Sequence, residues 1–163
     1  MRVRHLIERL NIALAFIAGI SMLVLTGLTT NEVIRRYFFN APTSWSLEIT
    51  EYLVVVCVYL GMAYSIQKGA HVSVPLVYNY FSRRIQRILD VTTSILLLVF
   101  WLVLLWQTLG MAIDYLIRDL KSETVLAFPL FYPMFIVAIG SLTSCVQAIL
   151  IIYDNFVRLP SKA

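Results

Sequence analysis

The amino-acid sequence predicts an all-α integral membrane protein with four transmembrane helices and a short amphipathic interfacial helix on the cytoplasmic side. Composition is the first reason: 60% of the 163 residues are hydrophobic and 13% are charged, whereas soluble domains are about half apolar and about one quarter charged. Second, four apolar segments reach the roughly 20 residues that a helix needs to cross a membrane core of about 30 Å. Third, these segments are continuously apolar and lack the two-residue alternation of barrel strands.

The four predicted spans form one membrane domain that occupies residues 1–163. They run approximately over residues 10–30, 48–66, 88–113 and 130–157. Pro129 and Pro133 place the start of the last span, because the first amides of a helix have no partner that a proline would remove.

The N-terminal "MRVRHLIERL" places basic residues before the first apolar run, as a secretory signal would. No small-residue cleavage site of the A-x-A kind follows, and the apolar run has the full length of a span. We therefore expect a retained first helix here rather than a cleaved signal.

Lysine and arginine counts predict the orientation, since these residues are enriched in cytoplasmic segments. Nine of them lie in the N-terminal segment, the loop between the second and third spans and the C-terminal tail, against four on the other side. Both termini are therefore expected in the cytoplasm. The basic face would also attract membrane phospholipids with anionic headgroups, so the pI near 9.2 requires no nucleic-acid partner.

The interiors of the predicted spans contain no acidic or basic side chain, which argues against a proton or drug antiporter. Asn11 and several acidic residues lie at or near the ends of the apolar runs, where water or headgroups are expected to reach them. Gln107 and Gln147 are the only amide side chains deep in a span, and an interhelical hydrogen bond would explain either one.

The positions and spacing of the cysteines and histidines do not indicate an active site or a cofactor site. Cys57 and Cys145 lie within spans and form no C-x-x-C pair, so buried structural thiols are expected. His5 and His71 lie outside the spans, where they could not act as facing haem ligands. No phosphate loop, metal cluster or nucleophile motif is visible. The sequence thus predicts neither an enzyme nor a cofactor, and suggests a helper for a larger partner.

The segment "RRYFFNAPTSWSLEITEY" at residues 35–52 joins the first two spans. Its arginines and aromatic rings resemble a belt that holds helix ends at the headgroup level. Ser44 or Ser46 is expected to cap the second helix. One interpretation is an ordinary interfacial turn. The other is that Glu48 or Glu51 meets a cation on another helix or subunit.

The segment at residues 67–90 predicts the amphipathic interfacial helix. From about Pro75 onward, apolar residues recur at helical spacing and polar residues take the opposite side. Arg84 interrupts the apolar face, so it either reaches to the headgroups or pairs with an acid on a partner.

Several of these stretches together resemble the small membrane subunit of the tripartite ATP-independent periplasmic (TRAP) transporters. They are "RYFF", "SLEITEY", "YLGMAYSIQKGAHVSV", "RRIQR" and "LAFPLFYPMF". Their order and spacing in a four-span chain carry the resemblance, which covers nearly the whole sequence.

The resemblance implies a subunit of a Na⁺-coupled uptake system for an organic acid, such as sialic acid or a C4-dicarboxylate, in a bacterial inner membrane. Its partners would be a large membrane subunit that moves the substrate and a periplasmic substrate-binding protein, with the small subunit as a brace. The candidate partner contacts are Arg36, Trp45, Glu48, Glu51, His71, Arg83, Arg84 and Arg87. The lipid-headgroup candidates are Arg35 and Tyr37.

Two alternatives remain open from the residues alone. A small channel or exporter acting by itself would need a polar stripe along one helix, and none is visible. An accessory or assembly subunit of another bacterial membrane complex would have the same physical profile.

Overall fold

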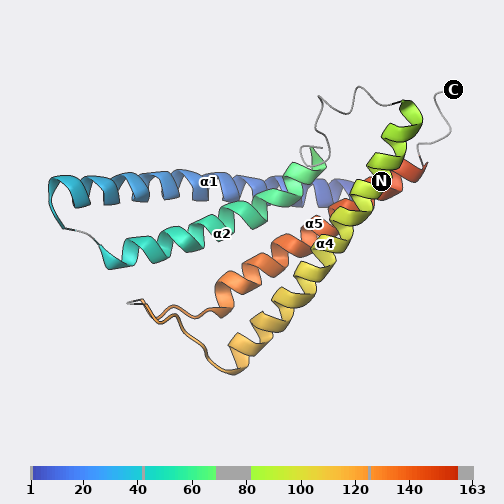
Figure 1. The fold of residues 1–163 in the computed structure, drawn as a ribbon. Coiled ribbons are helices and arrows are strands. Elements are labelled where there is room, and N and C mark those ends of the chain that lie inside the picture. Colours follow the sequence, from blue (N-terminus) through green and yellow to red (C-terminus); the bar gives the residue numbers. More distant parts are fainter. Residues whose placement is uncertain (1, 42, 69–81, 125, 158–163) are drawn as a thin grey trace.

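The structure is a computed structural model that describes residues 2–41, 43–68, 82–124 and 126–157. These residues contain the helices α1 (Arg2–Phe38), α2 (Ser44–Gln67), α4 (Arg83–Ile117) and α5 (Phe131–Val157) (Figure 1). Each of the four is long and apolar enough to cross a membrane. The predicted all-α membrane fold is therefore confirmed.

α1, α2 and α4 extend beyond the apolar runs that predicted them, whereas α5 stays within its predicted run. α1 has 37 residues, which at about 1.5 Å per residue makes it about 55 Å long. That length exceeds the hydrocarbon core of about 30 Å, so its ends reach past the apolar layer and carry charged residues such as Arg4 and Arg35. α5 begins at Phe131, between the two prolines that predicted its start.

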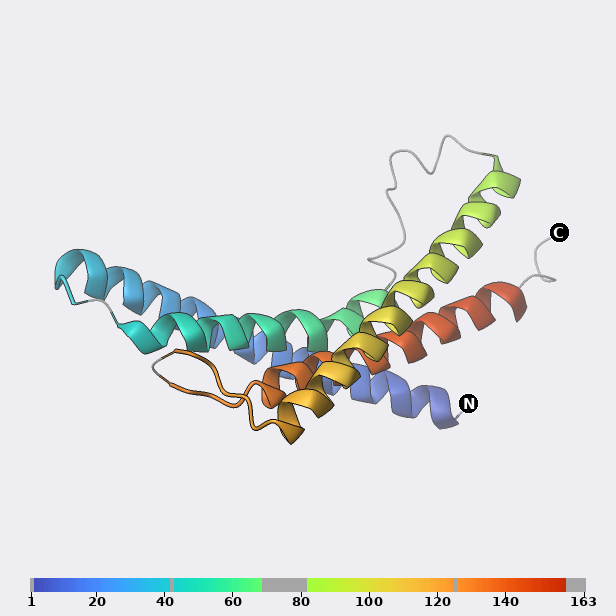
Figure 2. The same ribbon diagram turned by 60° about the horizontal axis from the view of Figure 1, so that its bottom comes forward.

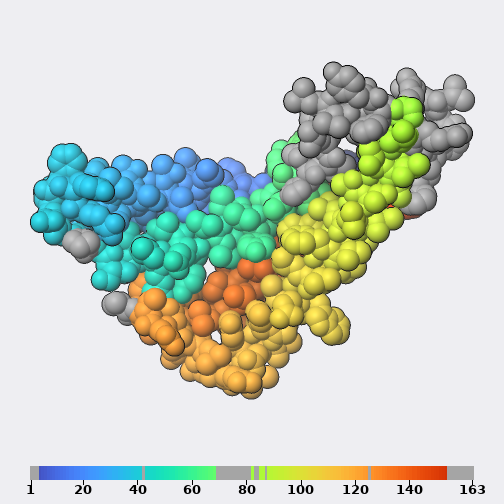
Figure 3. All heavy atoms as spheres, in the orientation of Figure 1, coloured from blue at the N-terminus to red at the C-terminus, as the bar shows by residue number. Residues whose placement is uncertain are grey.

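The helices pack in the spatial order α1, α2, α5, α4, each against its neighbour in that row. Figures 1 and 2 show two antiparallel pairs, α1 with α2 and α4 with α5. The pairs cross near the N-terminal part of α1 and diverge toward the turn between α1 and α2. Among the described helices α5 is the most buried. The arrangement is an open row rather than a closed bundle (Figure 3). Large apolar side chains of all four described helices are therefore exposed.

Small residues allow α5 to approach α2 closely. A Cβ atom added at Gly140 would lie 2.4 Å from the carbonyl oxygen of Tyr59 on α2. Ser141, Ser144 and Ala148 on the same helix are completely buried. Helices in lipid associate through such close packing, because lipid tails are as apolar as the side chains and provide no hydrophobic driving force.

The larger apolar side chains form a core where α2, α5 and α4 meet. It is centred on Ile66, Trp101 and Cys145, one residue from each helix. Cys145 is 3% exposed, in agreement with the structural role predicted for it. Both cysteines are free thiols, but Cys57 is only half-buried, so the expectation of a buried thiol is wrong for that residue.

The predicted interfacial helix lies mostly outside the described residues. From Arg83 onward the chain is already part of α4, which continues without interruption into the third span.

Replacing Gly140 with alanine is expected to lower the free energy of unfolding by about 1–3 kcal/mol, because the new methyl group would push α5 away from the α2 backbone. Equilibrium unfolding in mixed micelles measures this. Gly19→Ala on α1 is the matched control, since nothing lies within 4 Å of a Cβ atom there. Equal stability of the two variants would contradict the close α2–α5 contact.

Candidate functional site at the two ends of the helices

The turn between α1 and α2 is held by Glu32 on α1. Its carboxylate accepts hydrogen bonds from the backbone N–H of Thr43, at 3.2 Å, and from the Thr43 hydroxyl. The backbone N–H of Ala41 donates to the carbonyl of Arg35 at 3.1 Å, and Asn40 adopts a left-handed backbone with φ 51°. Glu32 therefore fixes the start of α2 against the end of α1, a role that the sequence analysis missed.

The predicted capping of α2 by Ser44 or Ser46 is wrong. Thr43 is the N-cap residue, with an extended backbone, and its side chain makes no capping hydrogen bond. Its hydroxyl is bound to Glu32 instead. Ser46 is buried and follows the cap.

Glu48 points into the protein. It is 3% exposed, and its Oε1 accepts a hydrogen bond of 2.7 Å from the Tyr52 hydroxyl, one turn further along α2. Thr124 and Ser122, from the loop between α4 and α5, place their hydroxyls beside the same carboxylate, although Oε2 makes no hydrogen bond of standard geometry. The Glu48 carboxylate thus contacts residues of this chain and does not face a partner protein.

The α4–α5 loop is a folded structure that reaches α2. The Ser122 N–H donates to the Phe128 carbonyl at 2.9 Å, and the Leu130 N–H donates to the Leu120 carbonyl at 3.1 Å. The Phe128 ring packs 4.9 Å from the Tyr52 ring, centroid to centroid. Figure 2 shows this loop beside the first turns of α2. Glu48 and Tyr52 therefore connect the two helix pairs at the end where the pairs diverge.

The other candidate partner contacts in the segment at residues 35–52 face outward. Glu51 is exposed and lines, together with Arg36, Glu32 and Thr43, a groove of about 310 Å³ between α1 and α2. Trp45 is 39% exposed nearby in sequence. The structure thus brings Arg36 and Glu51 to one groove and separates Glu48 from both.

The remaining candidates are placed only in part. Arg35 and Tyr37 are exposed at the end of α1. Arg83, Arg84 and Arg87 lie in the first turns of α4, and their side chains are outside what the structure describes. His71 lies outside the described residues altogether. The roles assigned to these residues stay predictions.

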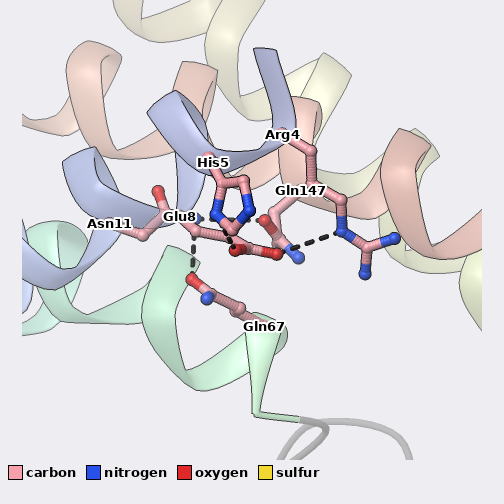
Figure 4. A network of polar contacts seen from close by, with 6 residues as sticks. All are labelled: Arg4, His5, Glu8, Asn11, Gln67 and Gln147. Atoms are coloured by element: carbon pink, nitrogen blue, oxygen red, sulfur yellow. Dashed lines mark hydrogen bonds and ion pairs between the residues drawn. The ribbon is translucent and has the colours of Figure 1, made fainter. Parts of the chain in front are cut away.

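A network of three amide side chains joins the helices at the opposite end (Figure 4). The Asn11 amide on α1 donates to Gln67 Oε1 on α2 at 3.2 Å and to Gln147 Oε1 on α5 at 3.1 Å. The interhelical hydrogen bond predicted for Gln147 is confirmed. The prediction that water or headgroups reach Asn11 is wrong, because α2 and α5 together bury it completely.

Charged residues continue this network toward the N-terminus. Arg4 Nε lies 3.0 Å from Glu8 Oε1, and His5 Nδ1 lies 3.6 Å from Glu8 Oε2. Arg4, Glu8, Gln67 and Lys68 line a cavity of about 190 Å³ beside the amides. Among the described residues no group of three metal-ligating side chains occurs. The site thus consists of amide and charged side chains that join the three helices at this end.

Four apolar helices, with acidic and basic residues only toward their ends, define a multi-pass membrane protein. The sequence profile of the family described as "Tripartite ATP-independent periplasmic transporters, DctQ component" matches residues 25–158. The chain belongs to this family, which confirms the resemblance found in the sequence.

A curated relative is the protein named "C4-dicarboxylate TRAP transporter small permease protein DctQ" of Vibrio cholerae serotype O1. It is 28% identical over 90 residues, which make up 55% of this chain and 39% of the relative. The match therefore spans less than half the length of that protein.

Glu48→Ala is expected to loosen the α4–α5 loop, since the carboxylate that Tyr52, Ser122 and Thr124 approach would be gone. Hydrogen exchange of the amides in residues 118–130 should become several-fold faster in the variant. Glu51→Ala removes the same side chain one turn later, where it faces outward, and should leave the exchange rates unchanged. Unaltered loop protection in Glu48→Ala would show that the carboxylate does not anchor the loop.

Asn11→Leu is expected to lower the free energy of unfolding by about 1–2 kcal/mol, because two interhelical hydrogen bonds are lost and the buried Gln147 Oε1 loses its donor. Thermal and chemical unfolding in detergent can measure the change. Asn31→Leu is the control, since Asn31 is exposed on the same helix. A destabilisation no larger than that of the control would refute the role of the amide network.

Proposed function

We propose that the chain is the small, non-transporting scaffold subunit of a Na⁺-coupled secondary uptake transporter for an organic acid. It would brace a large membrane subunit that works with a periplasmic substrate-binding protein in a bacterial inner membrane. The observation that carries this proposal is the family match over residues 25–158. The curated relative is named for C4-dicarboxylate transport, and a carboxylate is accordingly the substrate class we propose.

The absence of charge from the span interiors supports a subunit that does not itself move the substrate or the ion. Residues 10–31, 52–67, 91–113 and 131–153 contain no acidic residue, basic residue or histidine. Ion and proton pathways through membranes are usually lined by such groups, because a permeating charge must be compensated in the low-dielectric interior. The coupling ions and the substrate anion would therefore be bound by the large subunit.

The open row of helices supports a bracing role. A closed bundle buries most of its apolar side chains against itself, whereas here large apolar side chains of all four described helices are exposed. Such a layer offers a broad surface to a larger membrane protein and widens it against the bilayer. Two sets of polar contacts, one around Asn11 and one around Glu48, lie near opposite ends of the helices. They hold the α1–α2 pair and the α4–α5 pair in a fixed arrangement.

The orientation follows from the arginine and lysine distribution. Both termini would be cytoplasmic, so the α1–α2 turn and the α4–α5 loop would face the periplasm. Arg36, Trp45 and Glu51 would then be available to the large subunit or the binding protein. Glu48 would act indirectly, by holding the loop in the shape that a partner meets.

Sodium-dependent uptake into vesicles tests the proposal. Vesicles with the cognate large subunit and the binding protein should take up the organic acid when this chain is present and lose nearly all uptake when it is omitted. Vesicles with this chain alone should show none.

Two outcomes of the uptake experiment would contradict the proposal in different ways. Full uptake without the chain would refute an obligatory scaffold. Uptake by the chain alone would mean that a pathway runs through its four helices, as the channel alternative requires.

A further inference from the structure

The side-chain amide of Gln107 on α4 is exposed at a depth where lipid would surround it. Gln107 makes no side-chain hydrogen bond within the part of the chain that the structure describes. The other amides near span interiors, Asn11, Gln67 and Gln147, bond to one another. Two exposed hydroxyls on α1 are also satisfied: those of Thr26 and Thr29 donate to carbonyls one turn back at 2.9 and 2.8 Å. Gln107 therefore differs from all of these.

The depth of Gln107 can be judged from the two acidic residues that flank the apolar part of α4. Asp90 and Asp114 bracket it, and Gln107 lies five residues from their midpoint, or about 7.5 Å along the helix. The hydrocarbon core extends about 15 Å to each side of its centre. Gln107 thus lies well inside it, and a tilt of α4 would bring it closer to the centre.

Gln107 lies on the side of α4 that faces away from α5. The buried residues Ser94, Trp101, Thr108 and Ala112 follow one stripe of the helix, and α5 packs against that stripe. Gln107 is rotated by about 130° from it, at 100° per residue. The Gln107 side chain therefore starts from the face of α4 that is turned away from α5.

The neighbours of Gln107 on this outer face suit contact with a helix. Val103 is 64% exposed and Trp106 is 83% exposed, and nothing lies within 4 Å of a Cβ atom built at Gly110. Trp106 lies four residues from the same midpoint, about 6 Å, which is too deep for the headgroup-level belt. A large anchor residue beside a glycine resembles the centre of a packed interface. Figure 3 shows the surface of α4 at the outer edge of the row.

We propose that the outer face of α4 around Gln107, formed by Val103, Trp106, Gln107 and Gly110, binds a transmembrane helix of the large membrane subunit. This inference rests on the proposed function. The occupant must carry a hydrogen-bonding side chain or an accessible carbonyl at the depth of Gln107, because a primary amide in hydrocarbon needs both a donor and an acceptor opposite it. Lipid acyl chains provide neither.

Cross-linking identifies the occupant. A photoreactive benzoylphenylalanine at Val103, in membranes that contain the full complex, is expected to give an adduct with the mass of this chain plus the large subunit. Adducts with lipid only would overturn the proposal. An adduct of twice the mass of this chain would also overturn it, in favour of a second copy.

Substitution tests the amide itself. Gln107→Leu should reduce the large subunit that co-purifies with this chain by about three- to tenfold. The thermal stability of the chain purified alone should not fall, because the Gln107 side chain makes no hydrogen bond to any residue that the structure describes. Thr26→Val is the control, since the Thr26 hydroxyl already bonds to its own helix. Unchanged recovery with Gln107→Leu, or an equal loss with Thr26→Val, would overturn the proposal.

Co-purification of the wild-type chain with the large subunit distinguishes a failure of this inference from a failure of the proposed function. If the wild-type chain does not co-purify with the large subunit at all, the proposed function fails. If it does, and Gln107→Leu recovers as much, only the surface on α4 is wrong.

Discussion

The amide of Asn11 donates to one glutamine on α2 and to another on α5, and the arrangement of the helices at that end depends on this contact. α2 and α5 shield Asn11 from water, so its amide N–H groups donate to side chains on those neighbouring helices. The bond to Gln147 links the α1–α2 pair to the α4–α5 pair. A second polar contact, between Glu48 on α2 and the α4–α5 loop, links the same two pairs at the other end. Between these two contacts, Gly140 lets α5 approach the α2 backbone.

The fold class could be predicted because lipid imposes a simple rule on sequence: a helix that spans the membrane must be apolar for about 20 residues. The ends of the helices could not be predicted in the same way. α1 continues to Phe38, past the apolar run, because an exposed helix can carry charged residues as readily as apolar ones once it leaves the hydrocarbon. The apolar pattern therefore marks the membrane layer rather than the helix.

The candidate site was predicted less well, because its geometry depends on contacts between distant segments. Glu48 and Glu51 lie within one turn of α2 and look equivalent in the sequence. Only the loop that arrives from beyond α4 distinguishes them, by covering Glu48 and leaving Glu51 exposed. Asn11 was misjudged for a similar reason: its position along the helix axis suggested access to water, whereas its position around the axis faces two other helices. The available signal was the spacing of the small residues Ala18 and Ser21, 7 and 10 residues later on the same stripe, which the structure shows to be buried as well.

Gln107 and Gln147 have the same side chain and both lie in apolar spans, yet the structure treats them differently. Gln147 faces the inside of the row and is bonded there, so its amide serves the stability of this chain. Gln107 faces outward, and its amide has no hydrogen-bond partner in the described part of the chain. Exposed apolar residues cannot show which face of an open row meets protein, because lipid and protein interiors solvate them equally well. An exposed amide at that depth can, because only protein satisfies it. The amides inside the row, such as Gln147, therefore hold the helices together. The amide on its outside, Gln107, indicates that this face of α4 binds another protein.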